Sequence, residues 1–298
     1  MKALVYTKPS EMIYRDEPEP TASPGEVLIR VDAVGICGSD MHAYHGRDPR
    51  RIPPLILGHE LAGEILAGPG IGRRVTVNPL ITCGRCEFCV QGRNNLCANR
   101  TMIGMTRAGG FAQYVTTAAA SVIDLPQGMA TRTAALTEPA ATALHALDMA
   151  TRVLARPLPE CTVLVIGAGA VGLLASLLLK SYGCRHIRLA ETNPIRRASA
   201  ERAGGFTVHD PANTDRPAES SIDLVVDAVG AATTRQSALT VVKPGGVVMH
   251  IGLAGGASEI DMRKLTLAEI SLIGSYTYST ADLRAAARAL HDLSLIHI

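Results

Sequence analysis

Four cysteines in one short stretch are the residues of this chain best suited to bind a metal ion. They are Cys83, Cys86, Cys89 and Cys97, in the spacing C-x2-C-x2-C-x7-C. Thiolates bind zinc tetrahedrally, and ligands separated by two residues on a tight turn can face the same ion. The spacing therefore predicts a closed structural zinc site with four thiolate ligands, which itself performs no chemistry.

Two other uses of these cysteines agree less well with the sequence. The bacterial ferredoxin motif for an iron–sulfur cluster places its last cysteine after three residues and before a proline, whereas Cys97 follows after seven and precedes Ala98. Disulfides are disfavoured because the chain has seven cysteines, which cannot all pair, and because nothing directs it to an oxidising compartment.

A glycine-rich motif provides a second kind of chemistry, the binding of a dinucleotide. Residues 167–172 have the sequence GAGAVG, which matches G-x-G-x-x-G, directly after the β-branched run 162–166 and before a helix-like stretch. Such glycines permit a tight turn and let a pyrophosphate approach the helix N-terminus, where free N–H groups favour anions. The motif residues expected at the cofactor are Gly167, Gly169, Ala170, Val171 and Gly172.

The choice between NAD and NADP depends on residues beyond this motif. Glu191 lies 19 residues after Gly172, at the end of the next predicted strand. A carboxylate there would accept hydrogen bonds from a ribose diol and repel a 2′-phosphate, which favours NAD. Arg196 and Arg197 follow closely and could instead hold a 2′-phosphate, although arginines on a helix surface are the commoner explanation.

Composition limits the classes of function. With 298 residues, of which 47% are hydrophobic, the chain is expected to form about two globular domains. A net charge of +2 without a basic run argues against nucleic-acid and membrane-surface binding, so a small molecule is the expected partner. The N-terminus has no signal-peptide or transit-peptide pattern, and we expect a cytoplasmic protein.

The strands and helices that must position these motifs follow two different patterns, one in each half of the chain. Residues 1–148 are expected to form a β-rich domain, with strands at 26–33, 63–66, 74–78 and 112–117. Strand and helix then alternate over 149–275, which predicts a doubly wound parallel sheet of the α/β class. Its strands are expected at 162–166, 187–190, 222–228, 247–252 and 272–274, and its helices include 173–182 and 194–203.

One segment of the second domain also has the length of a membrane span. Residues 161–179 contain no charge over 19 residues. Three glycines interrupt the segment after its β-branched start, which indicates a buried strand, a turn and a helix. We therefore expect no transmembrane helix.

Two further fragments contain side chains suited to an open metal site. Residues 35–42 read GICGSDMH and residues 58–60 read GHE. With the four cysteines and the glycine motif in this order, the chain resembles the zinc-dependent medium-chain dehydrogenases of the alcohol, sorbitol and threonine dehydrogenase superfamily, from about residue 1 to about residue 290. The resemblance implies a GroES-like β-barrel catalytic domain and a Rossmann domain that binds NAD.

The same resemblance implies a second, catalytic zinc ion. Its ligands would be Cys37, His59 and a carboxylate from either Glu60 or Glu138. The segment 137–140, TEPA, resembles the glutamate-proline segment of the sorbitol dehydrogenase branch, where liver-type alcohol dehydrogenases have a cysteine. The alternative explanation of Glu138 is an acidic residue that begins a helix.

Roles for further residues follow from this resemblance. Three protein ligands leave one zinc position open for an alcohol oxygen, whose pKa the metal lowers before hydride passes to the nicotinamide. Ser39 matches the residue that takes the alcohol proton, and His42 matches the one that passes it toward solvent. Asp40 matches a carboxylate that orients His59. Cofactor contacts are also expected at Gly230 and Gly252.

The last residues carry two further expectations. A helix at 281–291 resembles the family segment that returns to the catalytic domain, within a third region at 276–298. Residues 293–298 resemble a translated sequencing adapter, so we expect a C-terminally truncated chain.

The predicted activity is oxidation of a secondary alcohol by NAD. The candidate substrates are polyols, simple alcohols and L-threonine, and the segment around Glu138 favours polyols. The alternatives are a catalytically inactive zinc-binding scaffold and, disfavoured by the charge balance, a nucleic-acid module. The resemblance implies a dimer or a tetramer.

Overall fold

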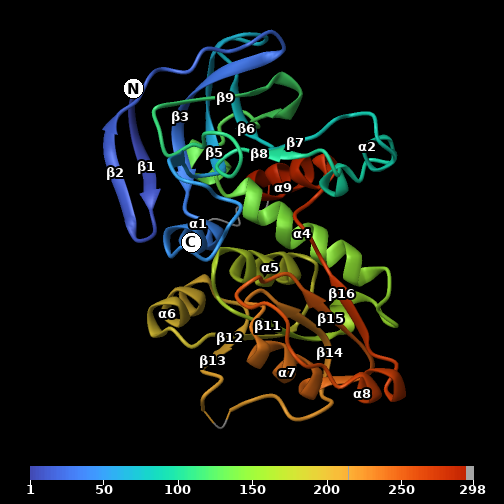
Figure 1. The fold of residues 1–298 in the computed structure, drawn as a ribbon. Coiled ribbons are helices and arrows are strands. Elements are labelled where there is room, and N and C mark those ends of the chain that lie inside the picture. Colours follow the sequence, from blue (N-terminus) through green and yellow to red (C-terminus); the bar gives the residue numbers. More distant parts are fainter. Residues whose placement is uncertain (214, 293–298) are drawn as a thin grey trace. The chain divides into compact units, whose positions relative to one another are not determined.

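The computed structural model describes residues 1–213 and 215–292, which form two compact units (Figure 1). The first unit contains Met1–Ala141 and Tyr278–Asp292, and the second contains Thr142–Thr277. The predicted fold class, a GroES-like β-barrel domain and a doubly wound parallel sheet, is confirmed. The predicted adapter-like tail at 293–298 lies outside the described residues.

The first unit is built on antiparallel sheets. Five strands pair in the order β10 (Val122–Asp124), β6 (Arg74–Val77), β5 (Glu60–Ala67), β3 (Glu26–Gly35) and β9 (Tyr114–Ala118). Three more pair as β2 (Glu11–Asp16), β1 (Lys2–Lys8) and β4 (Leu55–Ile56), and β7 (Leu80–Ile81) pairs with β8 (Thr101–Met102). Alternate side chains of these strands, such as Val27 and Ile29 of β3, form a buried apolar core.

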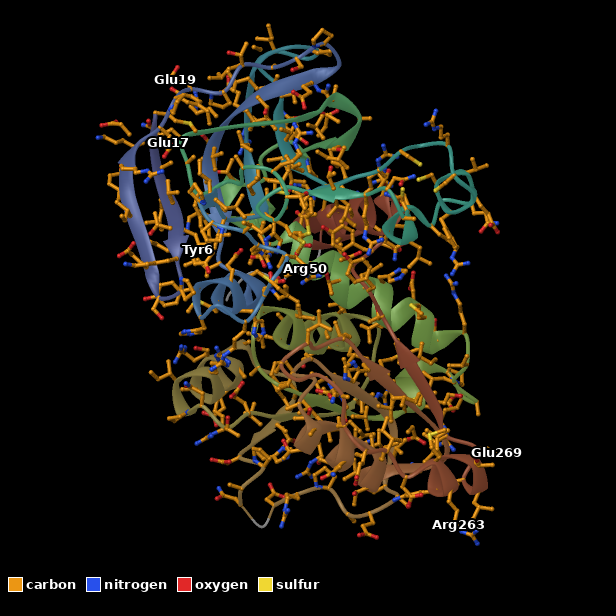
Figure 2. All side chains as sticks on the ribbon, in the orientation of Figure 1. Tyr6, Glu17, Glu19, Arg50, Arg263 and Glu269 are labelled. Carbon is orange, nitrogen blue, oxygen red and sulfur yellow. The ribbon has the colours of Figure 1, made fainter. Side chains whose placement is uncertain are left out.

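The first unit also contains the helices α1 (Gly38–Tyr44), α2 (Glu87–Val90), α3 (Thr131–Ala134) and α9 (Thr280–Asp292), with 3-10 turns at Asn94–Leu96 and Ala119–Ser121. The helix α4 (Thr137–Thr151) begins in the first unit and continues in the second, which also contains the 3-10 turn Leu158–Glu160. Tyr6 of β1, labelled in Figure 2, packs with Ala43 of α1 and with Leu57, and its side chain is 3% exposed. This contact fixes α1 against the barrel.

The second unit is a six-stranded parallel sheet with helices on its faces. The strand order is β13 (Thr207–His209), β12 (His186–Ala190), β11 (Thr162–Ile166), β14 (Ile222–Asp227), β15 (Val242–His250) and β16 (Ser271–Gly274). This order, 3-2-1-4-5-6, is that of a Rossmann domain. Its helices are α5 (Ala170–Ser181), α6 (Pro194–Ala203), α7 (Ala232–Val241) and α8 (Met262–Leu267). Figure 1 shows α5 and α7 on opposite faces of the sheet.

Each predicted strand and helix has a counterpart, with shifts at the ends. The helix predicted at 194–203 is α6, where the side chain of Asn193 accepts hydrogen bonds from two backbone N–H groups at the start and Gly204 ends the last turn. The uncharged segment 161–179 contains β11 and α5, and the described part of the chain has no helix long and apolar enough to cross a membrane.

Candidate functional site

Three of the residues predicted to bind a catalytic metal come together in the first unit. One ligand atom each from Cys37, His59 and Glu60 lies within 4.8 Å of the other two. Glu138, the other carboxylate considered from the sequence, is not part of this group among the described residues. The geometry therefore favours Glu60 as the third ligand.

The pairing of β3 with β5 explains why these residues meet. Gly35 at the end of β3 lies opposite Glu60 at the start of β5. A larger residue at Gly35 would displace the carboxylate of Glu60, because its Cβ would overlap Glu60 Oε2. Cys37 follows Gly35 and His59 precedes Glu60, so one end of this strand pair supplies all three ligands.

Asp40 connects two of these ligands. Its Oδ2 accepts a hydrogen bond of 3.0 Å from the backbone N–H of Cys37, across the first turn of α1. Its Oδ1 lies 3.5 Å from His59 Nδ1, and both atoms are buried without a hydrogen bond at normal geometry. The Nδ1 edge of His59 therefore faces Asp40, which leaves the other ring nitrogen available for a metal.

Arg51 is a buried partner of α1 that the sequence analysis did not single out. Its side chain is 0% exposed. Its Nη2 donates to Ser39 Oγ at 3.0 Å, its Nη1 to Asp48 Oδ2 at 2.6 Å and its Nε to the carbonyl of Gly104 at 3.0 Å. Burial favours a protonated Asp48, but hydrogen bonds and charges from Arg50 and Arg51 outweigh this and lower the pKa of Asp48 to about 2.

Ser39 and His42 stand one helical turn apart on α1. Residues separated by three positions share a helix face. Ser39 Oγ accepts its hydrogen bond from Arg51, which leaves the serine hydrogen free to point elsewhere. His42 is partly exposed in the last turn of α1.

Glu138 is buried in the first turn of α4. Tyr278 Oη donates a hydrogen bond of 2.8 Å to Glu138 Oε1, and Tyr278 is fully buried. Burial raises the pKa of Glu138, and burial together with the charge of Glu138 raises the pKa of Glu60 to about 7. Tyr278 was not predicted as a site residue, because it lies 140 residues from Glu138 in the sequence.

The side chains of Cys37, His59 and Glu60, with Glu138 nearby, fit a divalent cation. Two neighbouring buried carboxylates are costly to keep charged unless a cation lies beside them. Thiolate, imidazole and carboxylate are also the donor types that zinc binds in catalytic sites with one open position. The residues present therefore fit zinc.

The four cysteines of the predicted structural site also converge. Their sulfur atoms lie within 4.8 Å of one another, with 3.6 Å between Cys97 and Cys83 and 4.0 Å between Cys83 and Cys89. A tetrahedral zinc ion with bonds of about 2.3 Å places its sulfur ligands about 3.8 Å apart. Backbone N–H groups of Arg85 and Cys86 lower the pKa of Cys83 to about 6. These distances fit a four-thiolate zinc site.

In the second unit the glycine motif forms the turn between β11 and α5. A Cβ at Gly172 would overlap the carbonyl oxygen of Gly167, so the first turn of the helix contacts the backbone of the glycine turn directly. Gly169 precedes α5 and has open space around its Cα. Ala170 and Val171 begin the helix. The turn thus presents the N-terminus of a twelve-residue helix, as an anion site requires.

Glu191 lies at the end of β12 beside this turn. Its Oε2 accepts a 2.8 Å hydrogen bond from the backbone N–H of Ala168, and its Oε1 accepts one of 2.8 Å from Asn193. Arg196 Nη1 lies 4.0 Å from Glu191 Oε2 on a side chain that is 61% exposed. Arg197 instead bonds Asp210 and two backbone carbonyls.

The other two predicted cofactor residues, Gly230 and Gly252, follow β14 and β15. A Cβ at Gly230 would overlap the carbonyl oxygen of Gly252, so the two loops touch backbone to backbone. The buried Asp227 accepts hydrogen bonds from the N–H groups of Val229 and Gly230 at 3.0 and 2.8 Å. The glycine turn, Glu191, Gly230 and Gly252 follow the carboxyl ends of parallel strands, where open α/β sheets bind ligands, and Arg196 lies in the first turn of α6.

Comparison with known proteins agrees with both units. Residues 23–127 match the alcohol dehydrogenase GroES-like domain, and residues 170–292 match the zinc-binding dehydrogenase domain. L-galactonate-5-dehydrogenase of Escherichia coli K12 is 31% identical, over 100% of this chain and 91% of that protein. Sorbitol dehydrogenase of Bacillus subtilis 168 is 34% identical, over 94% of this chain and 83% of that protein.

A solved structure is similar over the whole length of the chain. A zinc-binding dehydrogenase of Sinorhizobium meliloti 1021, bound to NADP, has a TM-score of 0.88 and 31% identity, over 100% of this chain and 90% of that chain. The matching family model is that of zinc-binding dehydrogenases, and this solved neighbour holds NADP. The chain therefore belongs to the zinc-dependent medium-chain alcohol dehydrogenase superfamily and is an alcohol oxidoreductase.

Proposed function

We propose that the chain oxidises secondary alcohols, sugar alcohols above all, with NAD as the hydride acceptor. The observation that carries this proposal is the group of Cys37, His59 and Glu60, whose ligand atoms lie within 4.8 Å of one another. Zinc bound by these residues supplies a Lewis acid that lowers the pKa of the alcohol. A second zinc ion, held by the four cysteines of residues 83–97, has a structural role.

The chain's own side chains move the proton. Ser39 takes it from the alcohol, and His42, one turn further along α1, passes it to solvent. NAD held at the glycine turn of residues 167–172 would accept the carbinol hydrogen as hydride, so that the overall products would be a ketone, reduced cofactor and one proton. Asp40 keeps the ring of His59 in place during this step, because its Oδ1 faces Nδ1 at 3.5 Å.

The preference for NAD rests on Glu191. Two backbone N–H groups hold its carboxylate next to the glycine turn, where its negative charge disfavours a 2′-phosphate. The exposed Arg196 is the residue that could reverse this preference, and the Sinorhizobium structure holds NADP. We expect kcat/KM to be higher with NAD, and Glu191→Gln to reduce the ratio between the two cofactors.

Polyols are the favoured substrates for two reasons. The similar Bacillus enzyme is a sorbitol dehydrogenase, and the similar Escherichia enzyme acts on a sugar acid. The buried Glu138 belongs to the segment 137–140, which resembles the glutamate-proline segment of the sorbitol dehydrogenase branch. Simple alcohols and L-threonine are the remaining candidates.

The test is reduction of NAD and NADP with a panel of polyols, simple alcohols and L-threonine. Cys37→Ala and His59→Ala should each lower kcat by about a thousandfold, since metal stabilisation contributes several kcal/mol. Both should keep the zinc of the four-cysteine site. Cys161→Ala, which removes a buried thiol of the other unit, is the matched control. Full activity of Cys37→Ala would refute the assignment, and no turnover of any alcohol by the unmodified protein would favour an inactive scaffold.

A further inference from the structure

Arg235 of α7 uses every hydrogen of its guanidinium group. Its Nε donates to His250 Nε2 at 2.9 Å. Its Nη1 donates to the carbonyl of Gly256 at 2.8 Å and to Ser258 Oγ at 2.7 Å. Its Nη2 donates to the carbonyls of Gly230 at 2.8 Å and Gly255 at 2.9 Å. A guanidinium group has five N–H donors in a rigid fork, and here all of them have partners.

His250 is the last residue of β15, and the other four partners belong to two loops at the carboxyl ends of neighbouring strands. Gly230 follows β14, and Gly255, Gly256 and Ser258 follow β15. The loops already pair through their backbones, because the N–H of Gly255 donates to the carbonyl of Gly230 at 3.0 Å. Arg235 adds a side-chain clamp that holds both loops from α7.

The loop after β15 needs such a clamp. It contains three glycines between residues 252 and 256, and Leu253 in it is 66% exposed. Glycine has the largest conformational freedom of all residues, and an exposed side chain gives the loop little packing. The partners of Arg235 are carbonyl groups, a hydroxyl and an imidazole, so the group acts as a fork of donors and not as one half of an ion pair.

We propose that Arg235 is a positioning residue for the nicotinamide end of the cofactor. The inference rests on the proposed function and on the family resemblance, which implies cofactor contacts at Gly230 and Gly252, with the backbone around Gly252 near the nicotinamide. With the fork intact, the two loops have their binding shape before the cofactor arrives. Without it, only a fraction of molecules has that shape, and the apparent Kd rises by the inverse of this fraction.

The test compares NADH with ADP-ribose, which lacks the nicotinamide. We expect Arg235→Met to raise the Kd of NADH by about tenfold and to leave the Kd of ADP-ribose within about twofold. Arg235→Lys keeps the charge but not the fork, and should resemble Arg235→Met. Ser258→Ala removes a single acceptor and should have a smaller effect of the same kind. Binding of both ligands is measured by isothermal titration calorimetry well below the melting temperature.

Arg263→Met is the matched control, because Arg263 is an exposed arginine of α8 in the same unit (Figure 2). A merely structural role of Arg235 would lower the melting temperature and leave the Kd of NADH unchanged in the folded protein. An unchanged Kd of NADH in Arg235→Met, or in Arg235→Lys if the first variant does not fold, overturns the inference. Failure of the unmodified protein to bind either ligand would instead refute the proposed function.

Discussion

Asp40 connects the backbone of one predicted zinc ligand with the ring of another. Asp40→Asn keeps the size of the side chain but cannot offer an oxygen to both Cys37 N–H and His59 Nδ1. We expect the affinity for catalytic zinc to fall about ten- to hundredfold. Competition with a zinc-binding dye measures this, and Asp124→Asn, which removes an exposed carboxylate, is the control. An unchanged zinc affinity would separate Asp40 from the metal site.

Arg51 and Arg50 form a natural pair for comparison, because both bond Asp48. The side chain of Arg51 is 0% exposed and that of Arg50 is 54% exposed. Arg51→Met leaves buried acceptors without a donor and should lower the free energy of unfolding by about 3 to 5 kcal/mol. Arg50→Met should lower it by about 1 kcal/mol or less, because exposed pairs contribute little. Urea denaturation measures both, and equal losses would contradict the role of burial.

Residue type and spacing predict the ligands but not their supports. Cys37 and His59, with a carboxylate from either Glu60 or Glu138, could be singled out from the family resemblance, because few other residue types bind zinc. Arg51 and Tyr278 could not, since an arginine or a tyrosine has no preferred spacing from the group it supports. The contact between Tyr278 and Glu138 joins positions 140 residues apart, and only packing brings them together.

At the level of elements, helices and strands with clear sequence patterns were predictable, and very short strands were not. The helix at 194–203 has Asn, Pro and Gly at the positions where helices start and stop, and its bounds agree with the prediction. The strand β13 was missed because it has three residues at the edge of the sheet, too few to show alternation. The strand β15 begins before its predicted start at residue 247, because Pro244-Gly245-Gly246 in its first half is a sequence typical of a turn.

Asp223, near the start of β14, bonds residues at the starts of the neighbouring strands β11 and β15. Its carboxylate accepts a 2.8 Å hydrogen bond from Thr162 N–H of β11 and two of 3.0 Å from Lys243 of β15. Burial alone would raise the pKa of Asp223, but these donors outweigh burial and lower it below 3.8. Its stabilising effect is therefore complete above the unfolded-state pKa and is lost as pH falls through the lower folded-state pKa.

Asp223→Asn tests this linkage. We expect a loss of about 1 to 3 kcal/mol near neutral pH, because hydrogen bonds to a charged group are replaced by weaker ones. The loss should shrink as pH falls below the ordinary pKa of an aspartate, where the native carboxylate also becomes protonated. Urea unfolding at a series of pH values measures it. A loss that stays constant down to the lowest pH would show that the charge of Asp223 is not involved.

At the scale of the whole molecule, each compact unit has its own apolar core and its own predicted binding site. The first unit contains the two cysteine-containing groups predicted to bind metal, and the second contains the glycine turn. Within the first unit, the four-cysteine loop also holds the start of α9. Asn94 accepts a 3.1 Å hydrogen bond from the N–H of Thr280 and donates one of 3.0 Å to its hydroxyl. Tyr278, the partner of Glu138, lies two residues before Thr280.

Removal of the structural metal should therefore affect the first unit selectively. Cys86→Ala removes one thiolate of four, so the loop loses zinc and with it the anchor of α9. In calorimetry we expect Cys86→Ala to lower the melting temperature of the first unit alone. NADH at about a hundred times its Kd should stabilise the second unit by about 2.7 kcal/mol, in the variant as in the unmodified protein. If Cys86→Ala abolished this stabilisation by NADH, the loop would support the whole molecule and not one unit of it.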